Sequence, residues 1–313
     1  MENRLQTTEE TKTQIHERPV PEVVVYLIHF NAPEWLSSAI QSLNSSNGCS
    51  VKIGVIDNSA SLDANSVPAA VRLIEPGDNT GYTGGANRAL ADCRIHYPAA
   101  TEVVIAAHDA HVETQTLALL HASLAADPSI GIAYPHLLEP AATFGGTWDG
   151  RRATMITDPN MSQDAVWGSG TLMMLRMACV DDVGCFDEGF SSYAEDVDYG
   201  LRATDAGWKV HVDNRAAAWG LGSASPLAPR LIAVNSVRLR VKRSGWAALI
   251  PALAEQAFAL TRSLAVAVGY GKQSAESRVR ARESARNRAQ ILRQILTDLP
   301  SWHQTGVARE ARR

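Results

Sequence analysis

The chain has 313 residues, of which 45% are hydrophobic and 20% are charged, a balance typical of a globular protein with one large α/β domain plus an appendage, or with two modest domains. Its formal net charge of −4 argues against a nucleic-acid-binding protein, because neutralising phosphates requires a basic surface. The four cysteines, Cys49, Cys93, Cys179 and Cys185, show no CxxC spacing, which favours reduced, partly buried thiols over a disulfide or zinc framework.

The N-terminal segment carries no recognisable targeting signal. Residues 1–21 are polar and lack an apolar core, which predicts a flexible tail and not a signal peptide. No stretch of the chain runs eighteen residues without a charge or a helix breaker, so we expect no membrane span. Together these observations predict a cytoplasmic protein.

Strands and helices are predicted to alternate through the first half of the chain, beginning near Glu22. Residues 23–28 form a short, continuous and largely β-branched run, which suits a strand buried on both faces of a parallel sheet. A helix opening at Asn31–Glu34, with Pro33 in its first turn, continues through Leu43. The later predicted elements are strands at 51–56, 71–74 and 103–107 and helices at 85–93 and 114–125. This alternation predicts an α/β fold with a mostly parallel, twisted sheet flanked by helices.

The second half of the chain begins with a less regular pattern. Residues 140–165 are interrupted by glycine and proline, which predicts loops and a hairpin, and an apolar strand is expected at 171–175. A helix is predicted to begin at Glu195–Asp196 and to end near Ala206, with Gly207 as its stop.

From about Leu227 the pattern is purely helical. We therefore divide the chain into a tail (1–21), a catalytic α/β domain (22–226) and a C-terminal helical region (227–313). Charged residues interrupt the apolar face of this region, so it fits a domain cap or a homodimer surface better than a membrane-associated segment.

Two acidic residues follow predicted strands. In open α/β sheets ligands bind beyond the carboxyl ends of the strands, so Asp57 and Asp109 are expected to face one crevice. Asp57 could accept hydrogen bonds from a nucleobase or a ribose. Taken alone, however, Asp57-Asn58-Ser59 is better interpreted as the start of a turn, because these side chains bond their own backbone.

A glycine-rich segment, residues 79–87, precedes a predicted helix. Glycines let a backbone approach a ligand closely, and a helix N-terminus offers N–H groups to phosphate. The segment does not match GxGxxG, which argues against a dinucleotide fold. A phosphate site and a plain loop are equally good interpretations of this segment.

Asp109-Ala110-His111 places two potential metal ligands one residue apart. A carboxylate and an imidazole suit a Mn²⁺-like ion that bridges a diphosphate, and neighbouring His108 makes a zinc cluster conceivable. No third protein ligand is evident from the sequence. Without further context, a polar strand end is the simpler interpretation.

The densest group of acids is Glu195, Asp196 and Asp198, at a predicted helix start. Acids commonly stabilise a helix N-terminus through its dipole, by roughly 0.3–1 kcal/mol each. Like charges crowded this closely also raise one another's pKa, as a general base requires.

Taken in order, these segments resemble the family 2 glycosyltransferases of the GT-A fold, especially the rhamnosyltransferase-like members, over roughly residues 22–225. The matching segments are YLIHFNAP, VIDNSA, NTGYTGGANRAL, the DAH tripeptide where the family has DxD, WGSGTLMMLR, and FSSYAEDVDYGLRATDAGW. The last is the most specific, because it contains the family's ED pair and its D-x-x-x-R-x-x-x-x-G spacing.

This resemblance implies an inverting transfer of a sugar from a nucleotide-diphosphate sugar to an acceptor hydroxyl, on a secondary metabolite or a cell-envelope saccharide. It assigns the catalytic base to Asp196 with Glu195 beside it, and a divalent cation, Mn²⁺ or Mg²⁺, to Asp109 and His111. Trp167 and Gly170 are expected to border the acceptor pocket. The expected substrate contacts are Asn31, Asp57, Asn79, Gly81, Gly84, Gly85, Asn87, Asp109, Trp167 and Gly170.

The sequence departs from the family pattern at two places. The last acid of the DxD is His111 here, and Ala218-Trp219-Gly220 stands where many members carry a histidine. The resemblance therefore leaves metal dependence open, while it supports transfer itself.

Two other functions compete with this interpretation. A sugar nucleotidyltransferase shares the architecture but would need a phosphate loop rich in glycine and basic residues after the first strand, where this chain has His29–Pro33. A non-catalytic nucleotide-sugar-binding homologue is favoured slightly by the altered metal positions and disfavoured by the intact Glu195-Asp196.

Overall fold

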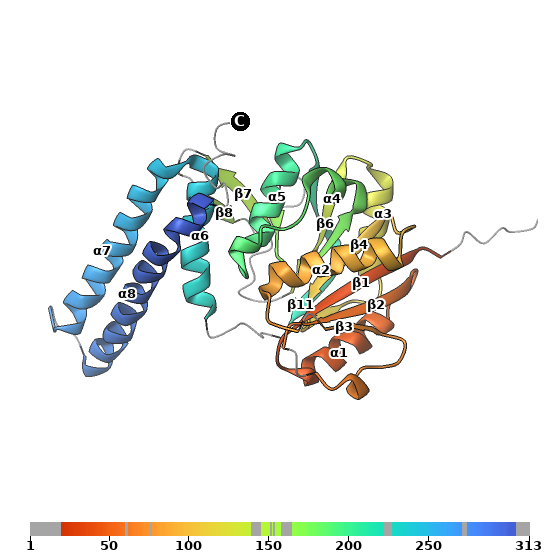
Figure 1. The fold of residues 1–313 in the computed structure, drawn as a ribbon, viewed down its shortest axis with the longest axis horizontal. Helices are drawn as coiled ribbons and strands as arrows, with labels where there is room; N and C mark the ends of the chain where they lie inside the picture. The colour runs from red at the N-terminus through yellow and green to blue at the C-terminus, as the bar shows by residue number, and fades with distance from the viewer. Residues whose placement is uncertain are drawn as a thin grey trace, which may run out of the picture.

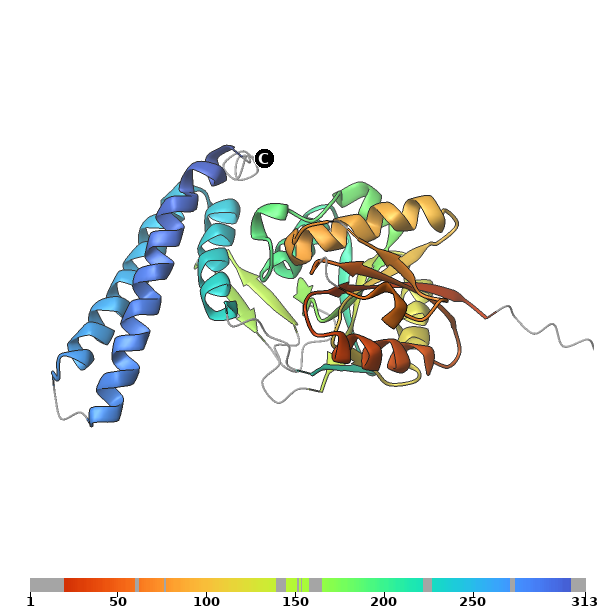
Figure 2. The same cartoon turned by 60° about the horizontal axis from the view of Figure 1, so that its bottom comes forward.

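The computed structural model describes residues 20–59, 62–75, 77–138, 145–150, 152, 154–157, 165–221, 227–270 and 274–304. They form an α/β body and a group of C-terminal helices that stands beside it. In both views α7 (Leu249–Ala267) and α8 (Ala275–Gln304) lie on the outside, and α6 (Ala228–Ser244) lies between them and the body (Figures 1 and 2). The fold is thus α/β with a C-terminal helical extension, as the sequence predicts.

The α/β body is built on an eight-stranded sheet in the order β3-β2-β1-β4-β10-β6-β11-β5. Parallel pairing joins β1 to β2 and β4, β2 to β3, and β6 to β11, whereas β10 runs antiparallel to β4 and β6, and β5 antiparallel to β11. The strands are β1 (Glu22–His29), β2 (Ser50–Asp57), β3 (Arg72–Ile74), β4 (Glu102–Ala107), β5 (Ala110–Val112), β6 (Ile130–Leu137), β10 (Leu172–Arg176) and β11 (Lys209–Gly220).

Helices cover both faces of this sheet. They are α1 (Pro33–Asn44), α2 (Gly81–His96), α3 (Thr116–Ala126), α4 (Met177–Val183) and α5 (Glu195–Asp205). The short 3₁₀ turns η1 (Ala64–Ser66) and η2 (Glu188–Phe190) belong to the same body, whereas η3 (Trp246–Ala248) lies among the C-terminal helices. Along β1, Val25 and Leu27 join the core under α1 and α3, whereas Val24 and Tyr26 join the core under α2 and α5. The strand is buried on both faces, which confirms the prediction from its continuous apolar run.

A small second sheet, in the order β8-β7-β9, lies beside α5. Strands β7 (Gly145–Asp149) and β8 (Thr154–Thr157) pair antiparallel, which confirms the predicted hairpin, and β9 is Trp167–Gly168. The parts of the predicted loop region at 140–144 and 158–164 lie outside the described residues.

The C-terminal helices are α6 (Ala228–Ser244), α7 (Leu249–Ala267) and α8 (Ala275–Gln304). They share an apolar core that includes Val234, Val241, Ile291, Ile295 and Trp302. Within the described part of the chain, none of the helices has the length and apolarity needed to span a membrane. Several large apolar side chains of α7 are exposed, among them Ile250, Phe258 and Leu264. A homodimer through these helices stays a prediction.

Some predicted elements need correction. Helix α2 begins at Gly81 and not near residue 85, and the strand at 172–176 is antiparallel within an otherwise mostly parallel sheet. The stop at Gly207 is confirmed, since α5 ends at Asp205 and Gly207 has a φ of 91°. The four cysteines are free thiols, as predicted, with three buried and Cys185 exposed.

Candidate active site

The loop that leads into α5, residues 190–194, is held in an unusual backbone conformation. We call it the entry loop. Ser191, Tyr193 and Ala194 have φ angles of 58°, 70° and 69°. Side chains other than glycine disfavour this left-handed region, at a cost of roughly 1–3 kcal/mol per residue, so surrounding groups must hold the loop in place. Residues with strained backbones are often found at functional sites, and here Glu195 and Asp196 directly follow the entry loop.

The N-terminus of α2 holds one side of the entry loop. The Thr83 backbone N–H donates to the Ser191 carbonyl at 2.9 Å, and the Tyr82 N–H donates to the Ser192 hydroxyl at 3.1 Å. A Cβ on Gly81 would lie 2.4 Å from the Ser191 hydroxyl oxygen, so only glycine fits there. The helix start and the entry loop therefore form one unit.

These contacts change the interpretation of the glycine-rich segment. Two N–H groups that were expected to face a phosphate donate to the entry loop, and the Gly81 N–H donates to the Asn79 side chain at 2.9 Å. A Cβ on Gly85 would lie 2.7 Å from Ile28, and one on Gly84 would lie 2.5 Å from Thr80, so both glycines permit close packing. In the described structure this segment docks α2, and its contact with a diphosphate stays a prediction.

Asn87 also anchors α2 to a neighbouring segment of the chain. Its side-chain amide donates to the Phe186 carbonyl at 3.0 Å and accepts from the Phe186 N–H at 2.8 Å. This reciprocal pair joins α2 to the segment before the entry loop. Substrate contact by Asn87 is a prediction that these bonds do not support.

The acid pair begins α5, and its two members differ in environment. Glu195 is buried, and its Oε2 has no hydrogen-bond partner among the described residues. Asp196 is half-buried, and its two oxygens accept backbone N–H groups of Gly170 and Val197, each at 2.8 Å. A Cβ on Gly170 would lie 3.4 to 3.5 Å from both carboxylates, which shows how closely that backbone approaches the pair.

These environments separate the two acids electrostatically. Burial, followed by the neighbouring charge of Asp196, raises the pKa of Glu195 well above its ordinary value. Burial also raises the pKa of Asp196, but the N–H groups of Gly170 and Val197 stabilise its ionised form and limit the rise. Asp196 therefore ionises first while Glu195 keeps its proton. Carboxylates separated in this way are suited to different tasks, with the ionised one able to accept a proton.

The third acid, Asp198, belongs to a buried ion-pair network. Its carboxylate pairs with Arg202 at 3.0 Å on the same helix and with Lys242 of α6 at 2.9 Å. Arg202 also donates to the Val183 and Cys185 carbonyls. The D-x-x-x-R spacing thus fixes α5 in the body and supplies no reacting group.

Tyr82 links the acid pair to the end of β4. Its hydroxyl donates to the Gly170 carbonyl at 2.6 Å. Burial raises the pKa of Tyr82, and so do the charges of Glu195, Asp196 and, further down in size, Asp109. Asp109 is buried just beyond the carboxyl end of β4, so the charges of acids from two parts of the chain act on the Tyr82 hydroxyl.

Asp57 lies at the end of β2 as predicted, but its carboxylate serves the turn that follows. The side chain is fully buried, and it accepts from the Ser59 N–H at 2.9 Å, from the Ser59 hydroxyl, and from the Leu62 N–H at 3.0 Å. Burial alone would raise the pKa of Asp57, but these hydrogen bonds outweigh it and lower the pKa. The turn interpretation is correct for this side chain, and the nucleobase contact stays a prediction.

We expect Asp57→Asn to lower the free energy of unfolding by roughly 1–3 kcal/mol, because an amide nitrogen would face N–H and O–H donors and leave one unsatisfied. Urea denaturation measures this, with Asp63→Asn, an exposed residue that caps η1, as the control. Weaker nucleotide binding by Asp57→Asn with unchanged stability would contradict this structural role and restore the base contact.

The predicted metal position is the clearest departure from expectation. His111 lies within β5, where its Nδ1 faces the Asp109 backbone carbonyl at 3.0 Å and its Nε2 faces the Ser38 hydroxyl at 2.7 Å. The ring also stacks on Trp219, with centroids 5.7 Å apart. Both ring nitrogens are thus engaged by the protein. Over the described ranges, no group of three or more His, Cys, Asp or Glu side chains is arranged to hold a metal ion.

Two histidines lie at the same edge: His108, which the sequence offered as a further metal ligand, and His29, for which it suggested no role. His29 ends β1 and His108 follows β4, with ring centroids 5.1 Å apart. Burial and then His108 lower the pKa of His29 to about 4, and burial lowers that of His108, so both rings are neutral near pH 7. His108 Nδ1 accepts from the Phe30 N–H at 2.8 Å. The strand-end position of His29 is the same signal that identified Asp57.

The remaining predicted contacts are spread around this edge. Asn31 is exposed in the turn after β1, with a φ of 44°. Trp167 is only 5% exposed and packs with Phe190 and Val197, and its place at the border of the acceptor pocket stays a prediction.

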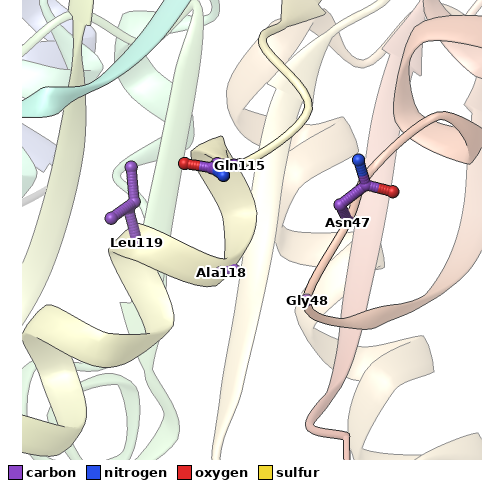
Figure 3. A pocket seen from close by; sticks show the side chains of 5 residues that line it. All are labelled: Asn47, Gly48, Gln115, Ala118 and Leu119. Carbon is purple, nitrogen blue, oxygen red and sulfur yellow. The ribbon is translucent and has the colours of Figure 1, made fainter.

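A shallow pocket of about 200 Å³ lies between the α1–β2 loop and the first turns of α3. Figure 3 shows its lining residues, Asn47, Gly48, Gln115, Ala118 and Leu119. None of them is titratable, and Asn47 and Gly48 precede the amino end of β2, opposite the end that carries Asp57. This pocket is separate from the candidate active site.

Comparisons with known proteins place the fold. The sequence matches no family model and no curated protein. The structure is similar to GalNAc-T7 with UDP, GalNAc and Mn²⁺, with a TM-score of 0.56 and 14% identity over 90% of this chain and 57% of that one. It is also similar to the mannosyltransferase PcManGT from Pyrobaculum calidifontis in complex with GDP-Man and Mn²⁺, with a TM-score of 0.52 and 15% identity over 89% and 88%.

A third similar structure, TarS from S. aureus, has a TM-score of 0.49 and 16% identity over 69% of this chain. The chain spans only 39% of TarS and 57% of GalNAc-T7, so it corresponds to a part of those proteins. The likeness to GalNAc-T7 covers 90% of this chain and that to PcManGT covers 89%. The chain therefore has the GT-A fold.

Proposed function

We propose that the chain is an inverting glycosyltransferase that uses a nucleotide-diphosphate sugar, with Asp196 as its base. The observation that carries this proposal is the acid pair, in which a half-buried Asp196 stands beside a buried Glu195 whose pKa is raised well above its ordinary value, directly after a strained loop. The GT-A fold supports the same conclusion, because the similar structures of PcManGT and GalNAc-T7 contain nucleotides and sugars.

The proposed reaction is a single displacement. An oxygen of Asp196 takes the proton of the acceptor hydroxyl, and the acceptor oxygen forms a bond to the anomeric carbon. The bond from that carbon to the diphosphate breaks on the opposite face, so configuration is inverted and nucleoside diphosphate leaves. The N–H groups of Gly170 and Val197 hold the two Asp196 oxygens in place for this step.

A first test of the proposed function is which nucleotide sugar the protein binds. A ligand that binds only the native state raises the apparent melting temperature, so a thermal-shift screen against UDP-, dTDP- and GDP-sugars identifies the nucleotide. The proposal predicts binding of at least one donor and its slow hydrolysis when no acceptor is added. Binding with no turnover under any condition would instead favour a non-catalytic nucleotide-sugar-binding homologue.

A metal ion fits the described residues poorly. GalNAc-T7 and PcManGT contain Mn²⁺, and Asp109 here offers the carboxylate oxygen that such an ion accepts. His111, the second expected ligand, has both ring nitrogens engaged by Ser38 and the Asp109 carbonyl.

We expect EDTA to slow transfer by less than roughly tenfold and not to abolish it, because the leaving diphosphate would rely mainly on protein donors. A divalent-ion titration of activity measures this, with His111→Asp as the matched variant that restores a carboxylate. Complete loss of wild-type activity in EDTA, recovered by Mg²⁺ and unchanged by His111→Asp, would show that a metal is required despite this geometry.

A further inference from the structure

The C-terminal helix α6 binds the backbone of the entry loop through the buried side chain of Asn235. Asn235, 4% exposed, donates from its amide nitrogen to the carbonyl oxygens of Phe190, Ser192 and Tyr193, each at 2.8 Å. An amide nitrogen has two hydrogens, so one of them is shared between two carbonyls. Since all three partners are acceptors, the nitrogen and not the oxygen of this amide must face the loop.

Two further side chains on the same face of α6 hold the flanks of the entry loop. Arg238 pairs with Asp187 at 3.3 Å and lies over the Phe190 ring at 5.2 Å. Lys242 pairs with Asp187 and Asp198, both at 2.9 Å. Residues spaced three and four apart share one face of a helix, so α6 presents Asn235, Arg238 and Lys242 as a row.

The opposite side of α6 is fixed in the C-terminal helices. Val237 packs in the core formed with α8. Leu239, by contrast, packs against the α/β body, with Trp167 and Phe190. In both views α6 stands between the body and the two outer helices (Figures 1 and 2). The position of the entry loop is therefore determined by the C-terminal region as well as by α2.

We propose that Asn235 is a positioning residue for the reaction, which holds the strained entry loop so that Asp196 faces the acceptor hydroxyl. The inference rests on the proposed function. Its physical basis is that a strained loop persists only where groups outside it hold its backbone. Asn235 donates to the carbonyls of Phe190, Ser192 and Tyr193, of which Tyr193 is itself left-handed and the other two flank left-handed Ser191. The C-terminal helices then act on catalysis without contacting substrate.

Asn235→Asp tests this proposal, because it keeps the size of the side chain and replaces the two-hydrogen donor by an oxygen that repels carbonyls. The control is Val237→Ala, which weakens the packing of the same helix without touching the entry loop. We expect Asn235→Asp to lower kcat by roughly tenfold or more with the donor KM changed by less than about threefold, the pattern of lost transition-state positioning. We expect Val237→Ala to lower the melting temperature and to keep kcat within about twofold of the wild type.

A second readout is independent of activity. Amide hydrogen exchange of peptides covering residues 190–198 is expected to speed up by roughly tenfold or more in Asn235→Asp and to change little in Val237→Ala. Unchanged exchange and an unchanged kcat in Asn235→Asp would overturn the inference, and so would equal effects of both variants. If the wild type binds donors but transfers no sugar, the proposed function fails, and the exchange rates alone decide whether Asn235 positions the entry loop.

Discussion

Asp196→Asn is expected to lower kcat by roughly 10²-fold or more while the affinity for the nucleotide sugar stays nearly unchanged. The amide has the size of the carboxylate but cannot accept the acceptor proton. Its oxygen can still accept one of the two backbone N–H groups, from Gly170 or Val197, so the start of α5 should remain folded. Steady-state kinetics with saturating donor and acceptor, together with donor binding by calorimetry, measures both quantities.

Asp205→Asn is the matched control for this variant. Asp205 ends the same helix and its exposed carboxylate pairs with Arg243 at the surface, so its loss should leave kcat within about twofold of the wild type. Near-normal turnover in Asp196→Asn would remove Asp196 from the proposed reaction.

Glu195→Gln is expected to stabilise the protein increasingly as the pH rises. In the wild type the folded-state pKa of Glu195 lies above its unfolded value, so the folded state binds the extra proton and loses stability as the pH rises through that interval. Glutamine does not titrate. The difference in unfolding free energy should therefore begin near the ordinary glutamate pKa of about 4.3 and grow by about 1.4 kcal/mol for each unit by which the pKa is raised.

Chemical denaturation across this pH range measures the effect, with the exposed Glu188→Gln as the control. We expect the turnover of Glu195→Gln to fall by less than that of Asp196→Asn, because Glu195 keeps its proton beside the base. A stability difference that is constant from acid to neutral pH would contradict the assignment of the proton to Glu195.

The sequence predicted the sheet well where the pattern is local. The continuous apolar run of β1 and the acids at the ends of β2 and β4 led directly to one edge of the sheet, where Asp57 ends β2 and Asp109 follows β4. The early start of α2 was missed, because Gly81, Gly84 and Gly85 disfavour a helix in isolation. Packing outweighs that preference, since the missing side chains allow contact with Ile28 and Ser191.

The remaining features of the site depend on residues far apart in the chain. Asn235 bonds carbonyls more than forty positions earlier, and nothing in the local pattern of α6 distinguishes it from a solvent-exposed amide. The tautomer and partners of His111 depend on Ser38 of α1, 73 positions away. The left-handed conformations of Tyr193 and Ala194 could not be predicted either, because neither residue type favours them.

The most direct test of the proposed function is the configuration of the sugar at the moment of release. When the identified donor is incubated with the enzyme and water is the only acceptor, proton NMR can follow the first anomer formed before it equilibrates. Single displacement with Asp196 as base predicts that this anomer is opposite in configuration to the donor. Two results would contradict the proposed reaction. One is release of the same anomer as in the donor, and the other is release by the wild type that is no faster than release by Asp196→Asn.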